Sequence, residues 1–197
     1  MDRTIDQILT DINGRIQNNL SYVGNNFYNL AVLQPRDGVT FPMRRTGTEE
    51  GKRINPDDTK GLQFYHRVLS QASSEEGGKG ISTYYTVVYQ MVFVGVGYRP
   101  TTTTATTWNN EDLAREVFQV FGQNPVLDNK ELLVAIGQTV TDKLTVLNQE
   151  FAGNTELRRN VLRLLAFKIE YTIKQKILGA ACIESNAVLG SELEAQL

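Results

Sequence analysis

Hydrophobic and polar residues alternate almost without a break in residues 167–177, FKIEYTIKQKI. Successive side chains of a β-strand point to opposite faces of the sheet. The pattern therefore predicts a strand with one apolar face and one charged face. The apolar face carries Phe167, Ile169, Tyr171 and Ile173, and the charged face carries Lys168, Glu170, Thr172 and Lys174.

Two further segments have the composition of strands. Residues 62–70, LQFYHRVLS, alternate, and residues 81–98 are rich in β-branched and aromatic side chains. The second segment is longer than an ordinary strand, so we expect a bend or bulge near Gly95 and Gly97. Residues 71–80 between the two segments have the composition of a flexible link, which predicts a hairpin.

Two segments have helical spacing. In residues 2–20 the apolar positions form one narrow stripe, and Asp2 or Thr4 suits the start of the helix. This helix is expected to pack on its own sheet, with a neighbouring subunit as the alternative. The apolar stripe consists of Ile5, Ile8, Leu9, Ile12, Ile16 and Leu20.

The second helix is predicted from Asn110 to Phe121, with Asn110 as its cap and Gly122 near its end. Its apolar side chains indicate a core helix that crosses the sheet; they are Leu113, Ala114, Val117, Phe118 and Phe121. Residues 131–151 fit a strand followed by a short helix or a turn. An all-helical reading is the alternative, and Gly137 disfavours it.

Residues 21–61 contain three prolines and five glycines and no long periodic stretch. The Asp37-Gly38 pair predicts a tight turn, and short extended pieces such as VTFPM are expected beside it. We predict a long arm over these residues. The whole pattern predicts an α+β fold in which helices lie on one face of a mainly antiparallel sheet. Residues 1–177 would form a single domain, and residues 178–197 a C-terminal tail.

The chain has 20 basic and 22 acidic residues and a net charge of −2. This balance disfavours a nucleic-acid binder that works by counterion release, although local basic patches remain. We favour protein docking over DNA contact for the basic residues, with ordinary solvation as the alternative. The candidate contact residues are Arg44, Arg45, Lys52, Arg53, Phe64, Tyr65, Arg158, Arg159 and Arg163.

No motif predicts catalysis, a cofactor or a metal. His66 is the only histidine and is expected to be structural, and Cys182 lies beside Glu184 instead of a positive charge. One cysteine excludes an intramolecular disulfide, and one His with one Cys cannot form the usual zinc site. Asp57 and Asp58 are more typical of a solvated turn than of a cation site.

Phosphate-binding and membrane segments are not indicated either. The stretches EEGGKGIS and GVGYRP lack the spacing and context of phosphate-binding loops. The start of the chain does not resemble a secretory signal, and the apolar run at 87–98 is too short to span a bilayer. We expect a soluble protein of a reducing compartment.

The combination of an amphipathic first helix, a hairpin with a long loop, one crossing helix and the closing strand LLAFKIEYTI resembles small head–tail connector, tail-terminator and tail-completion proteins of tailed bacteriophages. The stretches FYNLAVLQPRDGVTFPM and RINPDDTKGLQFYHRV resemble ring proteins of crAss-like phages more narrowly.

This resemblance implies a virion protein, made in the host cytoplasm, that forms a homo-oligomeric ring such as a dodecamer below the portal. Its partners would be copies of itself and portal or neighbouring connector and tail proteins, with non-specific contact to channel DNA and no membrane. The resemblance supplies no catalytic residue and no cofactor. Two alternatives remain: a monomeric cytosolic ligand-binding or adaptor module, and an enzyme that uses His66 with Asp57 and Asp58.

Overall fold

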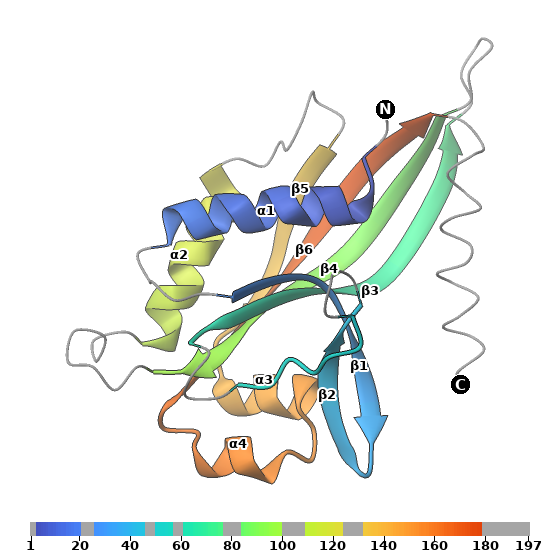
Figure 1. Ribbon diagram of the computed structural model, residues 1–197. Helices are drawn as coiled ribbons and strands as arrows, with labels where there is room; N and C mark the ends of the chain where they lie inside the picture. Colours follow the sequence, from blue (N-terminus) through green and yellow to red (C-terminus); the bar gives the residue numbers. More distant parts are fainter. Residues whose placement is uncertain are drawn as a thin grey trace.

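The computed structural model describes residues 3–20, 26–45, 50–56, 61–76, 84–99, 109–123 and 132–178 (Figure 1). These residues form an α+β fold around one six-stranded sheet. In chain order the elements are α1 (Ile5–Asn19), β1 (Asn26–Arg36), β2 (Val39–Arg44), β3 (Gln63–Glu76), β4 (Tyr84–Tyr98), α2 (Asn110–Gln123), β5 (Leu132–Val140), α3 (Lys143–Glu150), α4 (Thr155–Arg159) and β6 (Leu164–Leu178).

The strands lie in the order β2-β1-β3-β4-β6-β5, and every neighbouring pair is antiparallel except β1 with β3. This arrangement confirms the predicted α+β class, the mainly antiparallel sheet and the N-terminal helix. It also confirms the β3–β4 hairpin and the strand within residues 131–151, where the segment after the strand takes the helical one of its two predicted forms. None of the described helices is long and apolar enough to cross a membrane.

Helices cover both faces of the sheet, which corrects the expectation of helices on one face. Alternate residues of β4 enter two separate cores: Met91 and Phe93 pack in the core under α1 and α2, whereas Val92 and Val94 pack in the core under α3 and α4. The second core also covers the start of the charged face of β6. Lys168 on that face is only 8% exposed.

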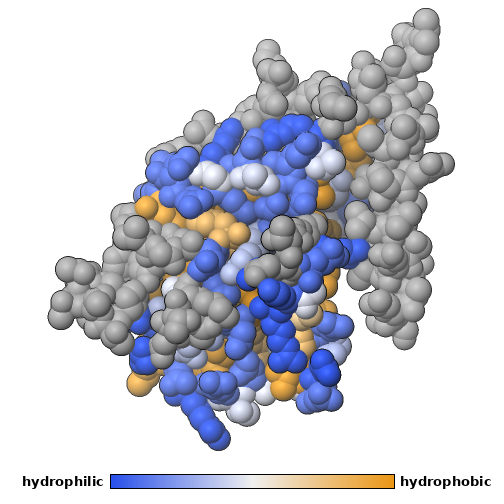
Figure 2. Space-filling view, in the orientation of Figure 1, coloured by the Kyte–Doolittle hydropathy of each residue, from blue (hydrophilic) through white to orange (hydrophobic). Residues whose placement is uncertain are grey.

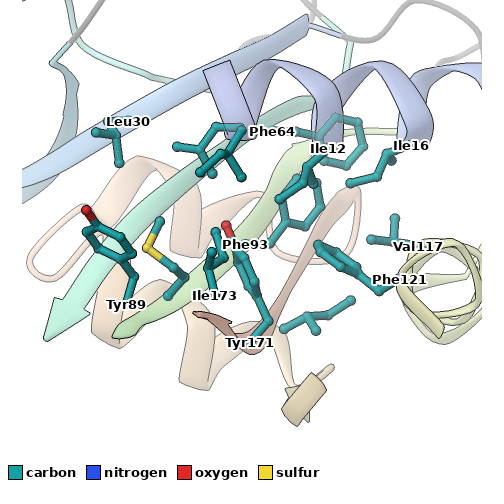
Figure 3. Packing of buried hydrophobic residues seen from close by; sticks show 14 of the residues in the cluster. Ile12, Ile16, Leu30, Phe64, Tyr89, Phe93, Val117, Phe121, Tyr171 and Ile173 are labelled. Atoms are coloured by element: carbon teal, nitrogen blue, oxygen red, sulfur yellow. The ribbon is translucent and has the colours of Figure 1, made fainter. Parts of the chain in front are cut away.

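The larger core is built around aromatic rings from neighbouring strands (Figure 3). Phe64 of β3 stacks on Phe27 and Phe93, with ring centroids 4.7 and 5.5 Å apart. Helix α1 closes this core with the predicted stripe of Ile8, Leu9, Ile12 and Ile16, all buried. Its outward face is largely hydrophilic (Figure 2).

The glycines of β4 permit close packing and do not mark a bulge. The β4–β6 register runs without a shift through Gly95 and Gly97, so the predicted bulge there is wrong. A Cβ on Gly95 would lie 2.4 Å from the Phe167 ring and 2.8 Å from the Phe64 ring. The irregularity lies instead in β3, between Val68 and Ser70.

Two predicted loops contain strand. Strand β3 continues to Glu76, so residues 71–76 extend the hairpin and are not a flexible link. In the predicted arm, β1 and β2 form a hairpin that belongs to the sheet. The turn between them is at the predicted place, because Asp37 and Gly38 have φ angles of 53° and 76°.

The helix starts agree with the sequence in part. Thr4 caps α1 in a capping box with Gln7, as predicted for one of two candidates. Helix α2 is capped by Asn109, whose Oδ1 accepts from the backbone of Asp112, and not by Asn110. Asn110 instead accepts from Ala166 N at 2.9 Å and ties the helix to β6. Phe118 is 41% exposed and lies outside the core face to which it was assigned.

Candidate interaction surface

The outer edge of β2 is covered by the chain itself. Ile54 N donates to Pro42 O at 2.9 Å, and Arg44 N donates to Lys52 O at 3.0 Å. At the other end of β2, Thr40 N donates to Ala152 O at 2.7 Å. These backbone groups of the edge are therefore satisfied within the molecule.

Among the described residues, most of the edge of β3 has no strand partner, and we call it the open edge of β3. Strand β1 runs beside β3 only from Asn26 to Leu30, opposite Gln63 to His66. Beyond His66 the two strands diverge (Figure 1), and none of the strands described pairs with residues 67–76 on that side. Val68 and Leu69 lie on this edge with 39% and 46% of their surfaces exposed. Open edges that carry apolar side chains favour pairing with another chain.

A groove of about 590 Å³ lies in the angle between the diverging strands. Leu30, Val32 and Leu33 line it from β1, and Val68, Leu69 and Gln71 line it from β3. Arg45 also lines the groove, which places one predicted contact residue beside the open edge. The groove combines apolar side chains with a strand edge that has no described strand partner.

Strand β5 forms the opposite border of the sheet. It pairs with β6 on one side, and no described strand pairs with its other side. Ala135, Gly137 and Gln138 of β5 are exposed. The sheet therefore has one covered edge, at β2, and two edges without a strand partner among the described residues.

The sheet face opposite α1 and α2 is polar where it extends beyond the core under α3 and α4. Gln90 of β4 and Lys174 and Lys176 of β6 are exposed there, and Thr172 is half-buried. Register places Thr172 beside Gln90, and their side chains are 3.3 Å apart. This is the outer part of the charged face that the alternation in β6 predicted.

The basic residues of the predicted arm pack against aromatic rings of the β1–β2 region. The Arg44 guanidinium lies 3.7 Å from the ring centroid of Tyr28, and that of Arg53 lies 3.6 Å from the centroid of Phe41. Such cation–π contacts contribute roughly 0.5–1 kcal/mol each at exposed sites. The Arg53 contact therefore helps to hold the covering segment on β2, together with the backbone of Lys52, whereas the Arg44 contact joins β2 to β1.

The second basic group lies at α4 and the turn after it. Arg158, Arg159 and Arg163 are exposed, and Leu162 between them is 86% exposed. Arg158 bonds to Asn148 Oδ1, and Arg163 lies 5.8 Å from the Tyr98 ring centroid. Burial, and then the nearby charge of Arg99, lower the pKa of Lys143 close to this group. The three arginines thus lie on the surface at one end of the molecule.

Phe64 and Tyr65 do not reach the surface. Both side chains are fully buried, Phe64 in the core under α1 and α2, and Tyr65 in the opposite core. Their assignment as partner-contact candidates is therefore corrected: they support the sheet from which the open edge extends.

His66 is a buried structural residue in this fold. Asn13 Nδ2 donates to Asn29 Oδ1 at 2.9 Å, which leaves Asn13 Oδ1 facing His66 Nε2 at 2.8 Å. Nε2 therefore carries the proton, and Nδ1 accepts from the Tyr171 hydroxyl at 2.6 Å. Burial lowers the pKa of His66 from 6.5 to about 3, so the imidazole is neutral. It has no exposed surface through which to reach a substrate.

A buried ion pair, which sequence reasoning missed, lies beneath the start of the open edge. Arg67 donates from Nε and Nη2 to the two carboxylate oxygens of Glu150 at 2.8 and 2.6 Å. Tyr65 donates its hydroxyl to the same carboxylate at 3.2 Å. Burial alone would lower the pKa of Arg67. The hydrogen bond to Glu150 and the attraction to its charge outweigh burial, so the pKa of Arg67 is raised. This pair fixes β3 to α3 at the point where β1 leaves.

Among the described residues, no group of three or more His, Cys, Asp or Glu side chains could hold a metal ion. Asp57, Asp58, Cys182, Glu184 and the glycine-rich stretch before β4 lie outside the described residues. The alternative that joins His66 to the Asp57–Asp58 loop gains no support, because His66 is enclosed by α1, β4 and β6.

A scan against protein-family models matches none, and a search of curated proteins finds no significantly similar sequence.

Proposed function

We propose that this chain is a structural protein of a tailed-phage virion. In this proposal it forms a ring in the head–tail connector or tail and joins the portal region to the tail around the DNA channel. Its partners are copies of itself, the portal or neighbouring connector and tail proteins, and channel DNA through non-specific contact. It has no catalytic role and uses no cofactor.

The single observation that carries this proposal is the pair of open sheet edges at β3 and β5. Ring assembly needs two different, complementary patches on each subunit, so that head-to-tail contacts close after a fixed rotation. In an isolated monomer such edges promote aggregation, and folded proteins usually protect them. This chain protects β2 with its own residues but leaves these two edges without a described strand partner.

The assignment to a phage virion rests on the resemblance in sequence. The stretch LLAFKIEYTI forms the first part of β6, and FYNLAVLQPRDGVTFPM forms most of β1, the turn and β2. The observed element order, with a first helix, hairpins and a crossing helix, is compatible with the expectation drawn from that resemblance.

The groove between β1 and β3 favours a second candidate, a monomeric ligand-binding or adaptor module. Its volume of about 590 Å³ lies in the range of small-molecule sites, and its lining is largely apolar. In that case the groove would hold a ligand or a peptide and the chain would remain a monomer.

Purified virions of the phage that encodes this chain provide the test. Mass spectrometry should detect the chain in several copies for each portal assembly, and the purified protein should co-assemble with the portal. Absence from virions, with a stable monomer that binds a small molecule in the groove, would contradict the ring and support the second candidate.

A further inference from the structure

We propose that the open edge of β3 pairs with β5 of a second copy of this chain, so that the sheets of neighbouring subunits join into one continuous sheet. The inference rests on the proposed ring and names the contact that closes it.

The register places the two open edges at the same height along the strand direction. Gln71 of β3 pairs with Tyr89 of β4, which pairs with Ile173 of β6, which pairs with Val134 of β5. A second row runs in the same way from Val68 through Met91 and Tyr171 to Ile136. In these rows the sheet has four strands, β3-β4-β6-β5, and neither end has a described strand partner.

The strand directions also match. Each of the three steps from β3 to β5 is antiparallel, so β5 runs opposite to β3 within one subunit. A rotation about an axis roughly parallel to the strands preserves their directions. It therefore brings β5 of the next copy beside β3 in the antiparallel sense, which forms the more stable ladder.

The other simple pairing, β3 with β3 of a second copy, covers fewer of the open edges. A two-fold contact of that kind would make a dimer and leave both β5 edges open. The β3–β5 pairing uses each open edge once in every subunit. A closed ring of such contacts removes the free edges altogether, as closure does in β-barrels.

The groove beside β3 leaves space for the incoming strand. It lies between β1 and the open edge, where Val68 and Leu69 are exposed. Ile136 of β5 is half-buried and belongs to the same sheet face as Val68, because the register row joins them. Apolar side chains on one face of the seam would meet and lose contact with water, which adds to the backbone hydrogen bonds.

Engineered cysteines test the seam directly in the full-length chain with Cys182→Ser. Ser70→Cys, Ala72→Cys and Ser74→Cys place a thiol along the edge of β3, and Ala135→Cys places one on β5; all four native residues are exposed. By register, these positions lie on one sheet face. Each β3 variant is mixed with the β5 variant under mild oxidation. At least one mixture should give an intermolecular disulfide, and the corresponding double variant should give a ladder of cross-linked subunits.

The control replaces the β3 cysteine with Lys174→Cys on the same face of β6, a strand that has partners on both sides. It should not cross-link to Ala135→Cys of another copy. An oligomer without any β3–β5 or β3–β3 cross-link would overturn the seam while the ring proposal stands. A dimer with only β3–β3 cross-links, or a chain that stays monomeric at high concentration with and without the portal, would overturn both.

Discussion

The hydroxyl of Tyr171 lies 2.6 Å from Nδ1 of His66, deep between α1 and the sheet. Both side chains are essentially without exposure, and Asn13 of α1 bonds to the other ring nitrogen at 2.8 Å. A continuous set of hydrogen bonds therefore joins α1, β3 and β6 through an otherwise apolar core. Because each of these polar groups has a partner, the network fixes one arrangement of these elements.

The first prediction concerns acid stability. The pKa of His66 is about 3 in the folded protein, below its ordinary value of 6.5. The unfolded chain therefore binds more protons below pH 6.5, and stability present above that pH is lost as the pH falls toward 3. The free energy of unfolding should fall by up to about 1.4 kcal/mol for each pH unit. Urea unfolding between pH 7 and about pH 5 measures it.

His66→Gln is the control for this effect, because it removes the only histidine of the chain. The variant should lose stability at pH 7, but its stability should change little from pH 7 to about pH 5. An equal slope in both proteins would show that His66 is not the titrating group. Since we assign His66 no catalytic role, the variant should still assemble wherever it folds.

The second prediction concerns the Arg67–Glu150 pair, which joins β3 to α3 at 2.6 and 2.8 Å. Glu150→Gln should lower the free energy of unfolding by about 3 kcal/mol or more, because it leaves the largely buried guanidinium of Arg67 without its counter-charge. Asp112→Asn is the control, since Asp112 and Arg115 form an exposed pair at 3.0 Å on α2. That change should cost about 1 kcal/mol or less. Chemical denaturation compares them, and equal losses would contradict this account of the buried pair.

The third prediction uses two glycines that differ in their surroundings. Gly95→Ala would place a methyl group 2.4 Å from the Phe167 ring, so the core must shift, at a cost of about 1–3 kcal/mol. Gly14 lies inside α1 with no heavy atom within 4 Å of an added Cβ. Gly14→Ala should therefore stabilise the protein by up to about 1 kcal/mol. Thermal unfolding should shift in opposite directions for the two variants, and a shift in the same direction would be the contrary result.

The fourth prediction concerns the polar sheet face. If β3 and β5 close a ring with α1 and α2 outside, the exposed Lys174 and Lys176 line its channel. The double change to Gln should then weaken non-specific DNA binding by the assembled ring and reduce its dependence on salt. Arg15→Gln with Arg115→Gln removes the same charge from α1 and α2, on the outer face, and should have the smaller effect. A larger effect of this outer variant, in a salt titration with duplex DNA, would place the DNA contact elsewhere.

The sequence predicts the local elements well where one face of an element is buried. The alternation of Phe167, Ile169, Tyr171 and Ile173 identified β6, because all four side chains enter one core. The prediction failed where two cores meet. Lys168 looked like part of an exposed charged face, but α3 and α4 cover that end of the strand.

The strand order could not be predicted, because it depends on pairing between distant segments. Nothing local indicates that β1 runs parallel to β3 or that β6 lies between β4 and β5. The ion pair between Arg67 and Glu150 was missed for the same reason, since 83 positions separate them. The open edge of β3 depends on where β1 leaves the sheet, and that point has no signal in the residues of β3 itself.

The mass of the purified full-length chain in solution tests the central claim, that copies of this protein assemble with one another, most directly. The mass is measured by mass photometry or native mass spectrometry over a range of concentrations, with and without the portal. We expect one discrete species at an integer multiple of the 22.1 kDa subunit. Electron micrographs of this species should show an annular shape. A species that remains at 22.1 kDa under all these conditions would contradict it.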